Sequence, residues 1–287
     1  MADSKEDIGA AIERRFGKPI AKIADAEGPA AWPRTWRDLA MRGSCRTFQQ
    51  RQVAPELVET LCALALTSPS KSDLQQRDIV IVDDRQIRAD LDGLLATGPL
   101  AQNWIPSAPV LLVFCANNRR QRQLHGWRDQ PFANDHLDAF FNAAVDASIA
   151  LSAFVIAAEA AGLGCAPISA IRNHAAKVSD LLALPDYVFP VAGLGLGWPT
   201  REPRISLRLP LAATLHRNRF DDTRIKEIVD AYDRRRHAAQ PMQRQRDIER
   251  FGAADFYGWS EDKVRQYADP ERADWGAFVR SKGFRLE

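Results

Sequence analysis

Three side chains suited to binding a phosphate stand at alternate positions in the segment RGSCRTF, residues 42–48. Arg42 and Arg46 each carry a planar guanidinium that donates paired hydrogen bonds to phosphate oxygens, and Ser44 adds a hydroxyl donor between them. The formal net charge of the whole chain is only +2 at pH 7, so these arginines do not belong to a general basic surface of the kind that binds nucleic acid. The segment therefore predicts a local anion site.

A second polar cluster, Ser70, Lys71 and Ser72, lies in the stretch SPSKSD. It follows a segment, residues 54–66, whose apolar spacing predicts a helix. Because a single helix separates two clusters of similar chemistry, they are predicted to face one anion. Either cluster taken alone is also typical of a solvated loop.

The elements that must position these residues alternate between helices and apolar strands. We expect helices over 85–96, 135–161 and 174–184, strands over 77–84, 108–117 and 188–198, and a loop or short strand over 165–173. The 135–161 helix is rich in alanine, so another helix can approach it closely. It is predicted to be central, with a homodimer partner as the neighbour.

The chain is predicted to consist of a main domain, residues 37–235, with an appendage at each end. Residues 1–36 form an N-terminal arm, in which the prolines of GPAAWPRTW favour an extended conformation. Residues 236–287 form a charged, helical C-terminal extension.

Several classes of protein are disfavoured by the same sequence. The four cysteines include no CxxC pair, and nothing matches the spacing of zinc ligands or of a catalytic triad. The glycines of GLGLGW lack the spacing of a dinucleotide-binding turn. The apolar run Ala147–Ala158 is too short to span a bilayer, and the N-terminus lacks the apolar region of a signal peptide, so a cytoplasmic protein is expected.

Taken in order, the motifs RGSCRTF, SPSKSDLQ, AAEAAGLG and LLALPDYVFPVAGLGLGWP resemble those of the flavin-dependent nitroreductase family. The stretch from ISAIRN to LRLP is similar to its NADPH-preferring branch of oxygen-insensitive nitroreductases and flavin reductases. The resemblance covers residues 38–235. It implies an α+β fold with a mixed sheet flanked by helices, and an obligate homodimer that binds FMN at the interface. It also implies reduction of nitroaromatics, quinones or flavins by NADPH or NADH through a ping-pong mechanism.

The resemblance also implies roles for individual residues. Arg42, Ser44 and Arg46 would hold the FMN phosphate and ribityl chain, with Arg208 near the phosphate and Ser70, Lys71 and Ser72 lining the cofactor. Gln102 would lie near the pyrimidine edge of the flavin, and the backbone of Ile168, Ser169 and Ala170 near its N5 atom.

Two other functions remain open from the sequence. The first is a flavoenzyme of the same fold with another reaction, such as ene reduction or dehalogenation. The second is a non-catalytic flavin-binding or interaction module. A small-molecule electron acceptor is expected for the alternative flavoenzyme, as it is for the NAD(P)H-dependent reductase.

Overall fold

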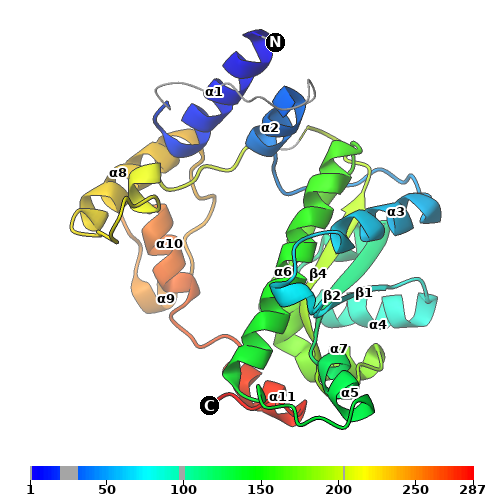
Figure 1. Cartoon of the computed structure of the whole chain (residues 1–287). Coiled ribbons are helices and arrows are strands. Elements are labelled where there is room, and N and C mark those ends of the chain that lie inside the picture. The colour runs from blue at the N-terminus through cyan, green and yellow to red at the C-terminus, as the bar shows by residue number, and fades with distance from the viewer. Residues whose placement is uncertain (1, 20–31, 97–100, 203) are drawn as a thin grey trace. The chain divides into compact units, whose positions relative to one another are not determined.

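The computed structural model describes residues 2–19, 32–96, 101–202 and 204–287, and the chain forms two compact units (Figure 1). The first unit comprises Met1–Gly43 and Arg204–Glu271, and the second comprises Ser44–Pro203 and Arg272–Glu287. The predicted arm, main domain and extension, with their limits at residues 36 and 235, stay a prediction. Residues 20–31 of that arm lie outside the described residues.

The second unit is built on a sheet with the strand order β1-β2-β4-β3. The strands are β1 (Arg77–Ile81), β2 (Val110–Asn117), β3 (Gly164–Ile168) and β4 (Val188–Gly197). Helices pack on the sheet, so the predicted α+β class is confirmed. The expectation of a mixed sheet is wrong for the described residues, because all three strand pairs are antiparallel. The continuous apolar runs that suggested central strands report burial on both faces and carry no information about strand direction.

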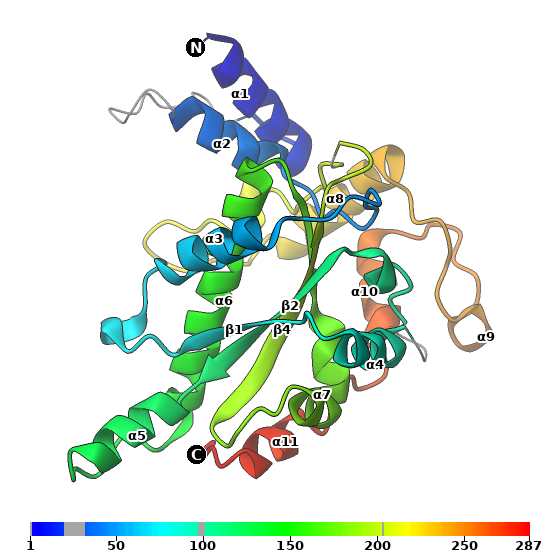
Figure 2. The same cartoon turned by 90° about the vertical axis from the view of Figure 1, so that its right-hand side faces the viewer.

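Alternate residues of β2 contribute to two cores, one on each face of the sheet. Figure 2 shows the helices that cover the two faces. Leu112 and Phe114 pack with α3 (Pro55–Leu66) and α6 (Leu137–Ala160). Leu111 and Val113 pack with α4 (Arg85–Leu95) and α7 (Ala175–Leu181) on the opposite face. The period-2 alternation of a strand explains how one apolar run serves both cores.

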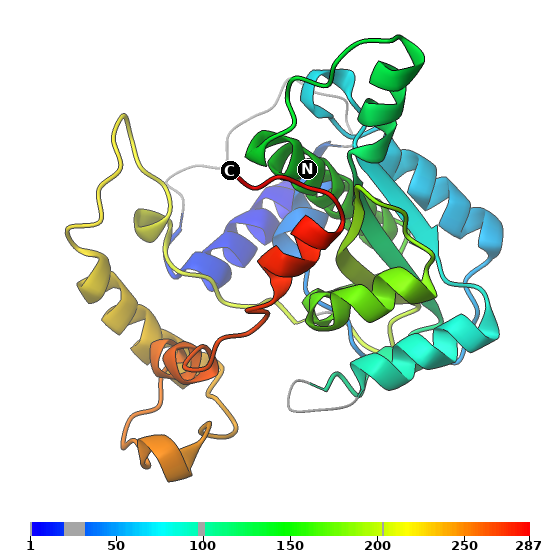
Figure 3. The ribbon, with the colours of Figure 1, turned by 90° about the horizontal axis from the view of Figure 1, so that it is seen from below.

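Helix α6 is the longest element and runs along the sheet (Figure 1). Among the described residues it is the single helix long and apolar enough to cross a membrane by length and composition. Its buried face packs on β2 and α3, as a core helix does. In its first half, Ala143 and Ala147 join a third core with Phe189 and with Phe284, which follows α11 (Trp275–Ser281). Figure 3 shows α11, in red, and the end of the chain that follows it.

The predicted helices and strands from residue 54 to 198 are confirmed. The 165–173 segment contains β3 followed by the 3-10 helix η3 (Ser169–His174), and α5 (Arg119–Trp127) was not predicted. The remaining short 3-10 helices are η1 (Lys71–Asp73), η2 (Ile105–Ser107) and η4 (Leu211–Ala213).

The first unit is helical. Its elements are α1 (Ala2–Phe16), α2 (Trp32–Met41), α8 (Ile225–Ala239), α9 (Ile248–Phe251) and α10 (Trp259–Gln266). The expectation of an extended conformation around Trp32–Trp36 is wrong, because α2 begins there. A proline is tolerated in the first turn of a helix, where its missing N–H has no intrahelical partner. The helix then places Trp36 and Leu39 beside α1.

Candidate functional site

Residues 44–48 run along the β3–β4 edge of the sheet. The amide of Cys45 donates to the carbonyl oxygen of Cys165 in β3 at 2.8 Å, and Phe48 forms an isolated bridge with Pro199 after β4. Cys45 and Phe48 are buried, whereas Ser44 and Arg46 are exposed. Cys45 therefore anchors the segment, and the alternation of an extended backbone presents Ser44 and Arg46 to solvent on either side of it.

Arg46 and Gln102 meet through Trp104. The Arg46 guanidinium lies 5.9 Å from the centroid of the Trp104 ring, and the indole N–H donates to Gln102 Oε1 at 3.0 Å. Trp104 in turn lies on β4, where a Cβ atom at Gly195 would come within 2.7 Å of its ring. The glycine of GLGLGW thus makes room for an aromatic side chain inside a strand, a role unrelated to a dinucleotide-binding turn.

Ile168, Ser169 and Ala170 lie where β3 ends and η3 begins. Ile168 is buried and pairs with Gly193 of β4, whereas Ser169 is exposed. These residues therefore share the β3 edge with Ser44 and Arg46. The second unit thus places five of the predicted cofactor ligands along the β3 edge of the sheet, namely Ser44, Arg46, Ile168, Ser169 and Ala170. Gln102 contacts Trp104, which packs on the neighbouring strand β4.

The loop that carries Ser70, Lys71 and Ser72 is fastened by Asp146 of α6. Ser70 Oγ donates to Asp146 Oδ2 at 2.6 Å, the Lys71 amide donates to Oδ1 at 3.0 Å, and the Gln76 amide donates to Oδ2 at 3.0 Å. Asp146 is fully buried. The carboxylate therefore fixes the loop between α3 and β1 at its middle, through Ser70 and Lys71, and at its end, through Gln76.

The same loop has a backbone that needs such support. Ser72, Asp73 and Gln75 adopt positive φ angles of 50°, 56° and 51°, which cost conformational energy in residues other than glycine. The buried Arg77 lies 3.8 Å from Asp146 Oδ2 and donates to the carbonyl oxygens of Leu66 and Ser68. The ion pair joins the base of the loop to α6, and the two hydrogen bonds join it to the end of α3.

Sequence reasoning missed Asp146 and Arg77 as parts of the site. One signal was present, because Asp146 is the sole charged residue between Asp138 and Glu159 in an apolar helix. A carboxylate on the buried face of such a helix requires partners. The sequence alone did not show that those partners are the Ser70 hydroxyl and two loop amides.

The two polar clusters lie far apart in one chain, so the expectation that a single helix brings them to face one anion is wrong. The Ser70–Ser72 loop leads into β1 at one edge of the sheet, where Arg77 is level with Ala116 of β2. Ser44 and Arg46 flank Cys45 beside β3 at the other edge, where Cys165 is level with Leu196 and thus with Val110 of β2. Val110 and Ala116 are near opposite ends of the same strand.

Arg42 and Arg208 belong to the first unit, and both are tied to Arg15 of α1. Arg15 Nη2 donates to the Arg42 carbonyl oxygen at 2.7 Å, and the Arg208 amide donates to the Arg15 carbonyl oxygen at 2.7 Å. The Arg208 side chain is exposed. Within this unit the backbones of two predicted phosphate ligands, Arg42 and Arg208, are therefore both bonded to Arg15.

The described residues contain no cluster of three His, Cys, Asp or Glu side chains able to hold a metal ion. None of the four cysteines forms a disulfide. Burial raises the pKa of the Cys45 thiol, that of Cys62 to about 11 and that of Cys115 to about 12. The Cys45 thiol of the arginine motif also donates to the Thr47 carbonyl oxygen at 3.3 Å. Cys45 therefore fills space in the motif and has little nucleophilic character.

We expect Cys45, Cys62 and Cys115 of the native protein to react slowly with Ellman's reagent at pH 8. The thiolate is the reactive form, and a thiol of pKa about 11 is ionised to only about a thousandth at that pH. All four cysteines should react in denaturant. Rapid labelling of Cys45, located by peptide mapping, would contradict its role as a filler residue.

Comparison with known proteins relates this arrangement to one family. The Nitroreductase family model matches residues 39–198, and the model of the Nitroreductase family, C-terminal domain matches residues 206–287. The match thus extends beyond residue 235, where the resemblance of the motifs stops.

Named relatives and solved structures agree with the family models. The chain is 32% identical over 202 residues to FMN reductase [NAD(P)H] of Bacillus subtilis, covering 69% of this chain and 79% of the relative. It is 34% identical over 177 residues to oxygen-insensitive NADPH nitroreductase of Salmonella typhimurium, covering 62% and 70%. The structure of B. megaterium NfrA2 superposes with a TM-score of 0.78 at 31% identity, covering 88% of this chain and 98% of the other.

A neighbour solved with a nicotinamide cofactor also matches. The NADPH:FMN oxidoreductase from Vibrio harveyi complexed with NAD+ has a TM-score of 0.74 at 26% identity and covers 87% of this chain and 97% of the other. The chain therefore belongs to the nitroreductase family, in the branch that contains FMN reductases and NADPH nitroreductases.

Proposed function

We propose that the protein is an FMN-dependent oxidoreductase that takes electrons from NADPH or NADH and passes them to a nitroaromatic, a quinone or a flavin. The observation that carries this proposal is the agreement of the two family models over residues 39–198 and 206–287 with relatives that are FMN reductases and NADPH nitroreductases. The small-molecule acceptor is reduced in the second half of a ping-pong cycle.

The donor groups of the chain suit FMN. Its phosphate is an anion, and the exposed Arg46 and Ser44 of the second unit supply the charge-assisted donors that a phosphate needs. Arg208, exposed in the first unit, is a donor of the same kind. The Gln102 amide, oriented by its bond from Trp104, suits the polar edge of a flavin. The loop of Ser70, Lys71 and Ser72 presents further donors, with Lys71 and Ser72 exposed.

The residues of the chain would bind and orient the cofactor, whereas the redox chemistry is that of the cofactor. When bound, FMN supplies the two-electron centre between nicotinamide and acceptor. Ser169 and the adjacent backbone would place donors beside the flavin, and Gln102 would orient its pyrimidine edge. No side chain is required to act as an acid or base in hydride transfer, so the proposal needs no catalytic triad.

A homodimer is part of this proposal. The two clusters stand at opposite edges of one sheet, so a single chain does not offer both to one cofactor. Helix α6 has one face occupied by Phe141, Val145, Ser148, Ser152 and Ile156, which are exposed or half-buried and carry no charge. Such a face suits close approach of a second copy. This second copy would bring its Ser70–Ser72 loop to the Arg46 cluster of the first.

We also propose that the enzyme works in the cytoplasm. None of the four cysteines forms a disulfide, as is usual in a reducing compartment.

The test is an anaerobic absorbance titration of the purified protein reconstituted with FMN. NADPH or NADH should bleach the flavin bands, and addition of a nitroaromatic or a quinone should restore them. Protein that binds FMN but is not reduced by either nicotinamide would instead support a flavin-binding module. Restoration by an activated alkene or a halogenated aromatic, and not by a nitroaromatic or a quinone, would indicate ene reduction or dehalogenation. Protein that stays colourless would refute the proposal.

A further inference from the structure

We infer that Arg15 is a positioning residue for the phosphate end of the cofactor site, because it joins the two backbone segments that carry Arg42 and Arg208. The inference rests on the proposed binding of FMN. It goes further by giving a role to α1, all of which precedes the first motif of the site.

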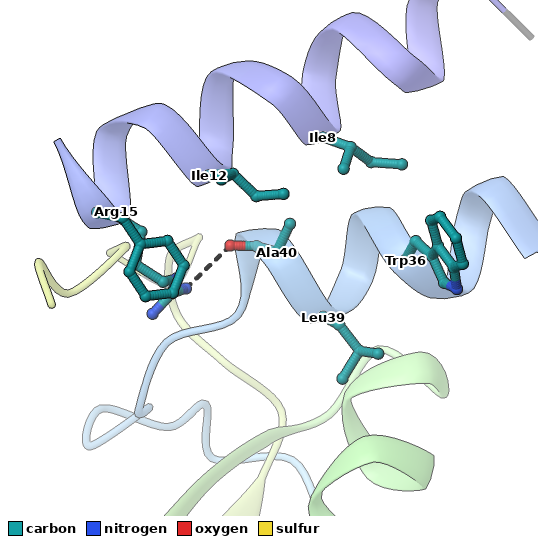
Figure 4. Close-up of a pocket in the computed structure, with 7 residues that line it drawn as sticks. Ile8, Ile12, Arg15, Trp36, Leu39 and Ala40 are labelled. Atoms are coloured by element: carbon teal, nitrogen blue, oxygen red, sulfur yellow. Dashed lines mark hydrogen bonds between the residues drawn. The ribbon is translucent and has the colours of Figure 1, made fainter. Parts of the chain in front are cut away.

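The side chain of Arg15 fixes the segment before Arg42. Its exposed fraction is 8%. Nη2 donates to the carbonyl oxygens of Ala40 at 2.9 Å and Arg42 at 2.7 Å, and Nη1 donates to that of Ser206 at 3.3 Å. One guanidinium therefore bridges the end of α2 and the 204–208 segment, which are distant in sequence. The bond to Ala40 is visible in Figure 4.

The backbone of Arg15 fixes the segment around Arg208. Its carbonyl oxygen accepts from the Arg208 amide at 2.7 Å and from Nη2 of Arg235 at 3.1 Å. The same Arg235 nitrogen donates to the Arg208 carbonyl oxygen at 2.8 Å. Both polar groups of the Arg208 backbone are thus held. The two fastened segments also touch, since a Cβ atom at Gly43 would collide with the Arg204 carbonyl oxygen.

Helix α1 delivers Arg15 to this position by apolar packing. Ile8 and Ile12 of α1 face Trp36 and Leu39 of α2 across a groove, and Arg15 stands at its end (Figure 4). The family match starts only at residue 39, so α1 lies outside it. The brace is therefore a contribution of this chain's own N-terminal segment to a site that the family segment carries.

The physical reason for such a brace is preorganisation. An arginine binds phosphate well when its backbone is fixed, because less conformational freedom is lost on binding. Two cations that must converge on one anion repel each other before it arrives, and hydrogen bonds to their backbones resist that repulsion. Arg15 supplies these bonds, and its own side chain does not bind the phosphate.

The experiment compares FMN with riboflavin, which lacks the phosphate, in the full-length protein. Dissociation constants for both are measured by quenching of flavin fluorescence in the wild type, R15Q, R15K and R14Q. Arg14 is the matched control, because it is an exposed arginine one residue away on the same helix. R15K keeps the charge but presents a single ammonium in place of the fork.

We expect R15Q to raise the dissociation constant of FMN about tenfold and to leave that of riboflavin unchanged. R15K should give an intermediate value for FMN, and R14Q a value close to that of the wild type. Equal weakening of both flavins would mean that Arg15 supports only folding, and would overturn the inference. So would unchanged FMN affinity in R15Q, provided that R42A weakens FMN. Failure of the wild type to bind either flavin would refute the proposed function itself, and the inference with it.

Discussion

Replacing Ser152 with glutamate is expected to leave the protein monomeric and to weaken FMN binding on the order of a hundredfold. Ser152 is exposed in the single chain, at the middle of the uncharged face of α6. In the proposed dimer this face is covered by the second copy, so the new carboxylate would be buried without a partner. Light scattering gives the mass, and a fluorescence titration gives the FMN affinity.

S152A is the matched control for this prediction. It keeps the side chain small and removes only the hydroxyl, so mass and FMN affinity should both stay those of the wild type. Circular dichroism of S152E should still show the folded spectrum, because Ser152 is exposed in the monomer and the cores do not include it. A dimeric S152E that keeps its FMN would show that the subunits meet elsewhere or that one chain suffices.

Removal of the Asp146 side chain is expected to lower the free energy of unfolding by about 3–5 kcal/mol, because it leaves Arg77 buried without its counter-ion. D146A also frees the Ser70 hydroxyl and the amides of Lys71 and Gln76 from their common acceptor. The loop should then leave its positive-φ conformation, and FMN affinity should fall. Chemical denaturation and FMN titration measure the two effects.

The comparison for D146A is D138A, which removes an exposed acid from the first turn of the same helix. D138A should lower the free energy of unfolding by less than about 1 kcal/mol and leave FMN affinity unchanged. If both variants lose equal stability, or if D146A binds FMN as tightly as the wild type, the carboxylate does not organise the loop.

The helices and strands of the second unit were predictable because their apolar periodicity is local. Val110–Asn117 had to be a buried strand and Leu137–Ala160 a helix, whatever their neighbours. Strand direction was not predictable, since a continuous apolar run is equally suited to either direction when both faces are covered. The conformation of Trp32–Met41 was missed because Pro33 was given more weight than the helical spacing of Trp36 and Leu39.

The site was predictable in its residue types and less so in its arrangement. Local chemistry singled out Arg46 and Ser70 as donors, but their separation across the sheet depends on the strand order, which no short motif encodes. Asp146 and Arg15 act through contacts across 76 and 27 residues of sequence. Their partners became known only from the folded chain.

The separation of Arg46 from the Ser70–Ser72 loop has a genetic consequence in the proposed dimer. Each cofactor would then depend on the arginine segment of one copy and the loop of the other. A cell that carries one allele damaged at Arg46 and another damaged at Ser70 would assemble mixed dimers. In these, one site combines both defects, and the second combines two intact halves. Two inactive alleles of this gene would therefore complement each other.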